Sequence, residues 1–190
     1  MKRIVFLLEE DSMKVLLDGL LPRLVPDLSF QCLAHEGKQD LEKSAPRKLR
    51  AWREPGVRFV VVRDQDSGDC REIKSSLARL CRESGKKDVL VRVVCRELEA
   101  WYVGDTEALG RAFPETKANA LRSLEGSRFR NPDNVVHPSD AIANLIPEFQ
   151  KRSGARRMAA VLSRDNRSRS FQEFVRGVER LWASMRAEPC

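Results

Sequence analysis

The stretch Phe59-Val60-Val61-Val62-Arg63-Asp64-Gln65-Asp66-Ser67-Gly68-Asp69 decides the fold. It opens with four apolar residues, three of them β-branched valines. Such a run is too short for a globular helix and favours a strand buried on both faces. Three aspartates follow in a Ser-Gly loop, and residues 70–82 have the apolar spacing of an amphipathic helix. This order is typical of a parallel α/β sheet, in which ligands bind at the carboxyl ends of the strands.

The same alternation of strand and helix fills the first half of the chain. Strands are predicted at 2–8, 28–34, 57–63 and 88–95, with helices at 12–24, 39–52 and 69–84. A spacing of about thirty residues indicates βαβ units, and hence a four-stranded, mostly parallel, Rossmann-like sheet flanked by helices. After residue 103 only helices are expected. We therefore predict an α/β domain over 1–103 and a C-terminal helical annex over 104–190 that packs on it.

Composition limits the class of protein. The 190 residues include five cysteines, and none of these stand in a Cys-x-x-Cys spacing, so neither a disulfide framework nor a zinc site is expected. No apolar run approaches the length of a membrane span. The apolar run at 4–8 is too short for a signal peptide and stops at Glu9. The sequence thus predicts a cytoplasmic protein that makes no contact with a membrane.

The net charge of +7 is concentrated near the end of the chain. Residues 151–190 carry ten basic and four acidic residues, and nine of the ten bases are arginine. Arginine suits phosphate better than lysine does because its guanidinium is flat and forked. This charge permits a nucleic-acid partner, although a solvated basic helix face explains it equally well.

Acidic side chains follow three of the predicted strands. They are Glu9, Glu10 and Asp11 after the first, Asp64, Asp66 and Asp69 after the third, and Glu97 and Glu99 after the fourth. Right-handed crossovers bring the carboxyl ends of parallel strands to one edge of the sheet. Two carboxylates about 5 Å apart repel each other by about 3 kcal/mol at an effective dielectric of 20. A divalent cation is the expected compensation.

The strand ends carry a resemblance to a known family. The relevant stretches are residues 6–12, 61–66, 95–101 and, near the end, 163–171. With Glu9 closing the first strand and Asp64-x-Asp66 closing the third, the chain resembles the Toprim superfamily. Within that superfamily it is similar to a small stand-alone group of unknown function related to OLD-type and abortive-infection nucleases. The usual Glu-Gly after the first strand is Glu9-Glu10 here.

The resemblance implies Mg²⁺ or Mn²⁺ on the acidic cluster and phosphodiester chemistry on DNA or RNA, often beside a partner ATPase in phage defence. Glu9, Asp64 and Asp66 supply the oxygen ligands that magnesium requires. A further metal ligand is expected from Glu97 or Glu99. On a continuous helix these two diverge by about 200°, and Glu97 is preferred because it lies nearer the strand end.

Other side chains have both a functional and a structural interpretation. Lys38 is a catalytic candidate that offsets charge on the scissile phosphate, or a surface lysine in the first turn of a helix. His35 is a general base or a hydrogen-bonded spectator. Asp69 is a metal ligand or the N-cap of the third helix. Trp101 stacks a base or packs between the sheet and the annex.

Five arginines are the candidates for contacts with the phosphate backbone, each with surface solvation as its alternative. They are Arg128, Arg130, Arg164, Arg167 and Arg169.

The resulting hypothesis is a Mg²⁺-dependent phosphodiesterase of the Toprim kind. The main alternative is a non-catalytic nucleic-acid-binding or regulatory subunit that works with an ATPase. A third is an enzyme acting on a small phosphorylated substrate. A phospho-receiver domain is disfavoured, because it requires a shorter chain and a lysine near the end of a late strand, and the sequence offers no convincing match to either.

Overall fold

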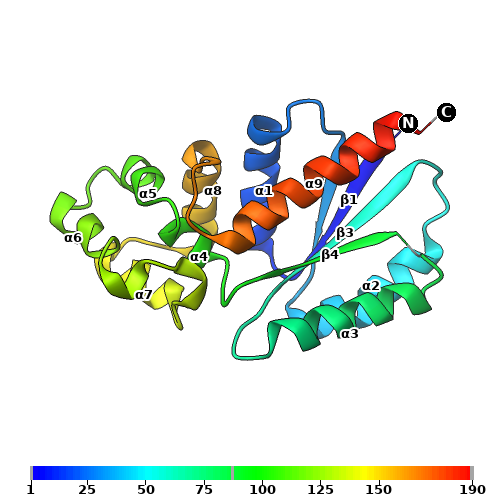
Figure 1. Cartoon of the computed structure of the whole chain (residues 1–190), viewed down its shortest axis with the longest axis horizontal. Helices are drawn as coiled ribbons and strands as arrows, with labels where there is room; N and C mark the ends of the chain where they lie inside the picture. Colours follow the sequence, from blue (N-terminus) through cyan, green and yellow to red (C-terminus); the bar gives the residue numbers. More distant parts are fainter. Residues whose placement is uncertain (1, 87, 189–190) are drawn as a thin grey trace.

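The structure, a computed structural model, describes residues 2–86 and 88–188. Its centre is a four-stranded sheet, and all of its strand pairs are parallel (Figure 1). The strands are β1 (Arg3–Leu8), β2 (Phe30–Ala34), β3 (Val57–Asp64) and β4 (Val89–Val94), in the order β2-β1-β3-β4. The predicted parallel α/β sheet is therefore confirmed, with β2 beginning two residues later than predicted.

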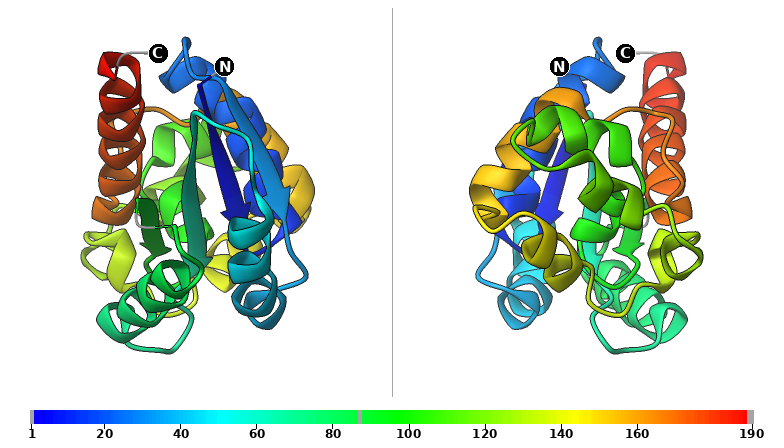
Figure 2. Two further views of the ribbon diagram at one scale, coloured as in Figure 1. Left: turned by 90° about the vertical axis from the view of Figure 1, so that its right-hand side faces the viewer. Right: turned by 90° about the vertical axis from the view of Figure 1, so that its left-hand side faces the viewer.

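Helices cover both faces of the sheet, and a group of short helices lies beyond the carboxyl ends of the strands (Figures 1 and 2). One face carries α2 (Lys38–Ala51) and α3 (Cys70–Glu83), and the other carries α1 (Asp11–Leu24) and α9 (Arg169–Ala187). Helix α8 (Lys151–Val161) packs against α1.

The short elements beyond the strand ends are α4 (Glu99–Val103), α5 (Thr106–Ala112), α6 (Ala118–Ser123) and α7 (Pro138–Leu145), with 3-10 turns η1 (Ser127–Phe129) and η2 (Pro132–Asn134). Across the described residues, none of the helices is both long and apolar enough to span a membrane.

The strands are buried on both faces, as their composition predicts. Val60, Val61 and Val62 of β3 are fully buried, and they alternate between two apolar clusters because successive strand side chains point to opposite faces. The smaller cluster lies between the sheet and helices α2 and α3, where Leu41 and Leu77 contribute to it.

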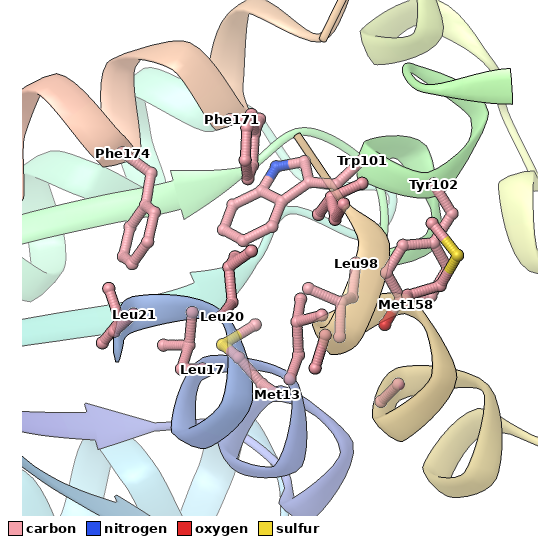
Figure 3. Close-up of a cluster of buried hydrophobic side chains, with 14 of the residues drawn as sticks. Met13, Leu17, Leu20, Leu21, Leu98, Trp101, Tyr102, Met158, Phe171 and Phe174 are labelled. Atoms are coloured by element: carbon pink, nitrogen blue, oxygen red, sulfur yellow. The ribbon is translucent and has the colours of Figure 1, made fainter. Parts of the chain in front are cut away.

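The larger cluster joins the sheet to the helices that follow residue 103 (Figure 3). Trp101 of α4 is fully buried, and its ring centroid lies 5.2 Å from that of Phe171 and 5.1 Å from that of Phe174, both on α9. Met13 of α1 and Met158 of α8 belong to the same cluster. One apolar core therefore extends from the sheet into the annex, and Trp101 has the packing role rather than the stacking one.

The loop before α9 locks α4 in place through buried hydrogen bonds. The side-chain amide of Asn166 donates to the carbonyl oxygen of Trp101 (2.8 Å), and its Oδ1 accepts from the backbone N–H of Ser168 (2.8 Å). A Cβ on Gly104 would lie 2.0 Å from Asn166 Oδ1, so only glycine fits at the end of α4. The segment that contributed to the family resemblance thus has a structural role here.

Candidate functional site

Asp64 is the last residue of β3, and it is almost fully buried (5% exposed). Its Oδ2 accepts a hydrogen bond from the backbone N–H of Leu98 (3.3 Å), whereas its Oδ1 is buried without a partner among the described residues. Burial raises the pKa of Asp64 well above its usual value, and the negative charges of Glu99 and Glu9 raise it further. A polar atom left in this state costs stability, which makes it a candidate for ligand binding.

Glu9 follows β1 and lies beside Asp64, because β1 and β3 are neighbours with Leu8 and Val62 in register. The backbone N–H of Asp64 donates to Glu9 Oε2 (3.0 Å), and Arg63 Nε is 3.9 Å from the same oxygen. Burial raises the pKa of Glu9, while the hydrogen bond from Asp64 opposes the rise. The structure thus brings together two of the three predicted core ligands.

Asp66 lies in the loop after β3 and has a left-handed backbone with φ of 54°. Its backbone N–H donates to the carbonyl oxygen of Arg96 (2.8 Å), which joins the loops after β3 and β4. Its carboxylate accepts a hydrogen bond from Lys38 Nζ (3.0 Å), and both side chains are substantially exposed. Lys38 therefore reaches the acidic edge, and its partner there is the second aspartate of the Asp-x-Asp motif.

Glu99 is the most deeply buried carboxylate of the described residues, with no exposed surface and no hydrogen-bond partner for either oxygen. Burial raises its pKa to about 7, and the charge of Lys151 acts in the opposite direction. The hydroxyl of Tyr102, three residues further along α4, is also buried without a partner in the part of the chain that the structure describes. Asp64, Glu99 and Tyr102 together form a buried group of unsatisfied oxygen atoms.

The carboxylate of Glu97 is bonded to the start of α7. Its Oε2 accepts a hydrogen bond from the backbone N–H of Ser139 (3.0 Å), at the start of α7, where a negative charge is stabilising. The charges that raise the pKa of Asp64 include that of Glu99, the strongest after burial itself. The structure thus places Glu99 nearer to Asp64 in electrostatic terms, although sequence reasoning preferred Glu97.

Lys151, the first residue of α8, is the cation of this region that sequence reasoning missed. Burial lowers its pKa, but the charges of Glu99, Glu10 and Asp64 outweigh that effect and hold the pKa above its usual value. Packing of α8 against α1 brings this lysine to the acidic edge. No motif signals the contact, because it depends on how two helices far apart in sequence pack.

The donor chemistry of the edge suits a hard divalent cation, because the available atoms are carboxylate oxygens. However, no group of three or more acidic, histidine or cysteine side chains within residues 2–86 and 88–188 is already arranged to hold a metal ion. Asp66 is paired with Lys38, and Glu97 is bonded to α7. Binding would require rotation of exposed side chains such as Asp66 toward the unpartnered Oδ1 of Asp64.

Two further candidates have structural partners. The Nδ1–H of His35 is placed to donate to the carbonyl oxygen of Leu8 (2.8 Å), and its Nε2 to accept from Lys48 Nζ (2.7 Å). Burial lowers the pKa of His35, which favours the neutral form that these bonds require. Asp69 Oδ1 accepts the backbone N–H groups of Arg71 (2.8 Å) and Glu72 (2.9 Å), so it is the N-cap of α3.

Two of the five candidate arginines brace the annex. Arg164 pairs with Glu179 (2.6 Å) and also donates to the carbonyl oxygen of Leu24. Arg167 donates to the carbonyl oxygens of Val103 (2.8 Å) and Leu124 (3.3 Å). These bonds satisfy carbonyl groups at helix ends, so both guanidinium groups have a structural role.

The other three candidate arginines, Arg128, Arg130 and Arg169, are exposed. The guanidinium of Arg128 lies 5.5 Å from the centroid of the Phe129 ring. Within the described residues, none of the three forms a salt bridge. They remain available to a ligand.

The fold is shared with regions of known structure. The C-terminal region of the Burkholderia pseudomallei OLD protein is 18% identical, with a TM-score of 0.54, and the match covers 94% of this chain and 98% of that one. The corresponding region of the Xanthomonas campestris pv. campestris OLD protein is 16% identical, with a TM-score of 0.51 and coverage of 97% and 98%. No curated protein matches this chain in sequence. A family profile matches residues 8–179, and the chain therefore belongs to DUF4276, described as a domain of unknown function.

Proposed function

We propose that this protein is a Mg²⁺-dependent, phosphodiester-cleaving enzyme of the Toprim kind that acts on DNA or RNA in the cytoplasm. The observation that carries the proposal is Asp64, a buried carboxyl at a strand end with one oxygen unsatisfied. Glu9 and Glu99 add negative charge around it. A bound divalent cation would satisfy the oxygen and offset the repulsion together.

Four carboxylates are the proposed metal ligands: Glu9, Asp64, Asp66 and Glu99, with Glu97 as the alternative to Glu99. When bound, Mg²⁺ or Mn²⁺ supplies Lewis-acid stabilisation of the phosphate and activation of water. Sharing of the fold with the C-terminal region of OLD proteins supports the assignment, as does the resemblance of the strand-end motifs to the Toprim superfamily.

The two lysines at the edge have complementary parts in this proposal. Lys38 is exposed, and its pairing with Asp66 is that of a surface ion pair, worth about 0–1 kcal/mol. If Asp66 held the cation, Lys38 would lose this pair at small cost and would be free to face a phosphate oxygen. Lys151 is held in its charged form by the carboxylates of Glu99, Glu10 and Asp64, so it offsets part of their negative charge.

The test is a cleavage assay with Mn²⁺ on plasmid DNA and on RNA. Wild-type protein should cleave at least one substrate, and Asp64→Asn should abolish the cleavage. Asp88→Asn is the matched control, because Asp88 is exposed and pairs only loosely with Arg58 (3.4 Å). Equal cleavage by wild type and Asp64→Asn would mean a contaminating nuclease and would refute the proposal.

A second candidate is a non-catalytic nucleic-acid-binding or regulatory subunit of an ATPase system, as in phage defence. The Lys38–Asp66 pair favours it, because this lysine neutralises an aspartate that the metal would need. The lack of a ready-made metal cluster among the described residues points the same way. This alternative predicts nucleic-acid binding with neither cleavage nor heat of Mn²⁺ binding.

A further inference from the structure

Strand β4 is an edge strand of the sheet and lies between α3 and α9 (Figure 2, left). A pocket lined by residues of these three elements contains several basic side chains. Its volume is about 320 Å³. The lining comes from α3, β4, η2, α9 and the residue after β4, and it includes Cys70, Lys74, Arg92, Cys95, Arg169 and Ser170. Two acidic residues, Asp133 and Glu173, also line it.

The charges of this pocket are not balanced. Asp133 is occupied by hydrogen bonds from Ser168 Oγ (2.6 Å) and from the backbone N–H of Ser170 (2.8 Å). Glu173 pairs with Arg176 (2.7 Å) on the same helix. By contrast, Lys74, Arg92 and Arg169 have no carboxylate oxygen within 4.0 Å in the part of the chain that is described. With three basic and two acidic side chains in its lining, and with Glu173 paired to Arg176, the pocket carries a net positive charge.

Gly177 of α9 leaves room for the guanidinium of Arg92. Arg92 is half-buried in β4, and its guanidinium donates to the carbonyl oxygens of Glu173 (3.1 Å) and Val91 (3.2 Å). A Cβ on Gly177, in the middle of α9, would lie 2.2 Å from Arg92 Nη2. Glycine inside a helix is less stable than alanine at the same position. Helix α9 thus loses stability at the position that accommodates this guanidinium.

Arg169, at the start of α9, also lowers the stability of this helix. Arg169 is the first residue of the helix, whose first turn contains no acidic residue. A positive charge near a helix N-terminus is unfavourable, because the helix dipole has the same sign there. The glycine beside Arg92 and the positive charge of Arg169 both lower the stability of α9, which is the pattern expected where residues serve a ligand.

We propose that this pocket binds the sugar–phosphate backbone of a nucleic-acid strand and leads it to the acidic edge. The inference extends the proposed function, since it names where the substrate is held. Val94 is the register partner of Asp64, and adjacent strands lie about 4.8 Å apart. Cys95, which lines the pocket, directly follows Val94. A nucleic-acid strand held in the pocket therefore lies beside the candidate metal ligands.

The test is the salt dependence of binding to a single-stranded DNA oligonucleotide in EDTA, where metal and cleavage play no part. Each phosphate contact contributes about 0.7 to the slope of log K against log salt. The pair Lys74→Gln and Arg169→Gln should therefore lower the slope by about 1.4. The control pair Lys43→Gln and Arg50→Gln removes the same charge from exposed positions on α2 and should leave the slope unchanged.

Gly177→Ala provides a second test that does not remove charge. The new methyl group meets the end of a flexible arginine and not backbone, so the protein should fold. The gain in helix propensity offsets the loss of the Arg92 hydrogen bonds to Glu173 and Val91, so the denaturation midpoint should change little. Affinity for the oligonucleotide should fall nonetheless, because Arg92 is moved. Weaker binding together with retained stability is a result that a purely structural role of Gly177 does not predict.

Two outcomes would overturn the inference. One is an equal loss of slope in the pocket variant and the α2 control, which would mean binding by diffuse charge. The other is an unchanged slope with DNA but lost binding of poly-glutamate, which would assign the pocket to an acidic protein. Failure of the nuclease proposal is separate, because oligonucleotide binding is measured in EDTA, where neither metal nor cleavage contributes to the result.

Discussion

Glu99→Gln should stabilise the protein above neutral pH. The Glu99 carboxyl is fully buried, both oxygens lack partners among the described residues, and burial raises its pKa from 4.5 to about 7. At 1.36 kcal/mol per pH unit, this rise corresponds to about 3 kcal/mol. Replacement by the uncharged amide removes the cost of ionising a buried group and keeps the side-chain shape.

The sign follows from proton linkage. Because the folded state holds the Glu99 proton more tightly than the unfolded state, its favourable contribution is complete below pH 4.5 and is lost as pH rises through about 7. The free energy of unfolding of wild type should therefore fall across this window. Glu99→Gln lacks that fall and should exceed wild type by up to about 3 kcal/mol at pH 8 and by little at pH 4.

Urea denaturation at a series of pH values measures this difference directly. Glu83→Gln is the matched control, since Glu83 is exposed and its ion pair with Arg79 is long (3.9 Å). This substitution should change the free energy of unfolding by less than about 0.5 kcal/mol at every pH. If Glu99→Gln and Glu83→Gln gave the same profile, Glu99 would not be an uncompensated buried carboxyl, and the electrostatic argument for a cation would be lost.

Two other predictions concern the metal ligands and the lock on α4. Lys38→Gln frees the Asp66 carboxylate from a surface ion pair, so Mn²⁺ affinity measured by calorimetry should rise by up to about fivefold, with stability changed by less than about 1 kcal/mol. Weaker binding would mean that Lys38 orders the site. Asn166→Ala removes buried hydrogen bonds to Trp101 and Ser168 and should lower the free energy of unfolding by about 2–4 kcal/mol in urea. Asn119→Ala, at an exposed position, is the control. If both substitutions lowered the free energy of unfolding by the same small amount, the Asn166 hydrogen bonds would not hold α4 in place.

The α/β sheet follows from the sequence because its signals are local. Runs such as 59–62 are short, apolar and β-branched, and the helices between them have amphipathic spacing and turn residues. The meeting of Glu9 and Asp64 follows as well, because parallel strands bring their carboxyl ends to one edge. Local pattern and chain topology were sufficient for both.

The details of the edge depend on contacts that no local pattern reports. The exclusion of one of Glu97 and Glu99 assumed a continuous helix, whereas α4 begins at Glu99 and Arg96 has a left-handed backbone with φ of 62°. The preference for Glu97 rested on its nearness to the strand end, which does not report the direction of its side chain. The packing of α8 on α1 places Lys151 at the acidic edge of the sheet. Arg167 donates hydrogen bonds to carbonyl groups that come close only when the annex folds. These side chains are positioned by tertiary structure, so their sequence neighbours do not predict their roles.

Calorimetric titration of Mn²⁺ into the wild-type protein and Asp64→Asn tests the central claim most directly. The claim is that carboxylates from separate strands hold one hard cation at the edge of the sheet. It predicts saturable binding to wild type and to Asp88→Asn, and loss of that binding in Asp64→Asn. Identical heats for all three proteins would contradict it.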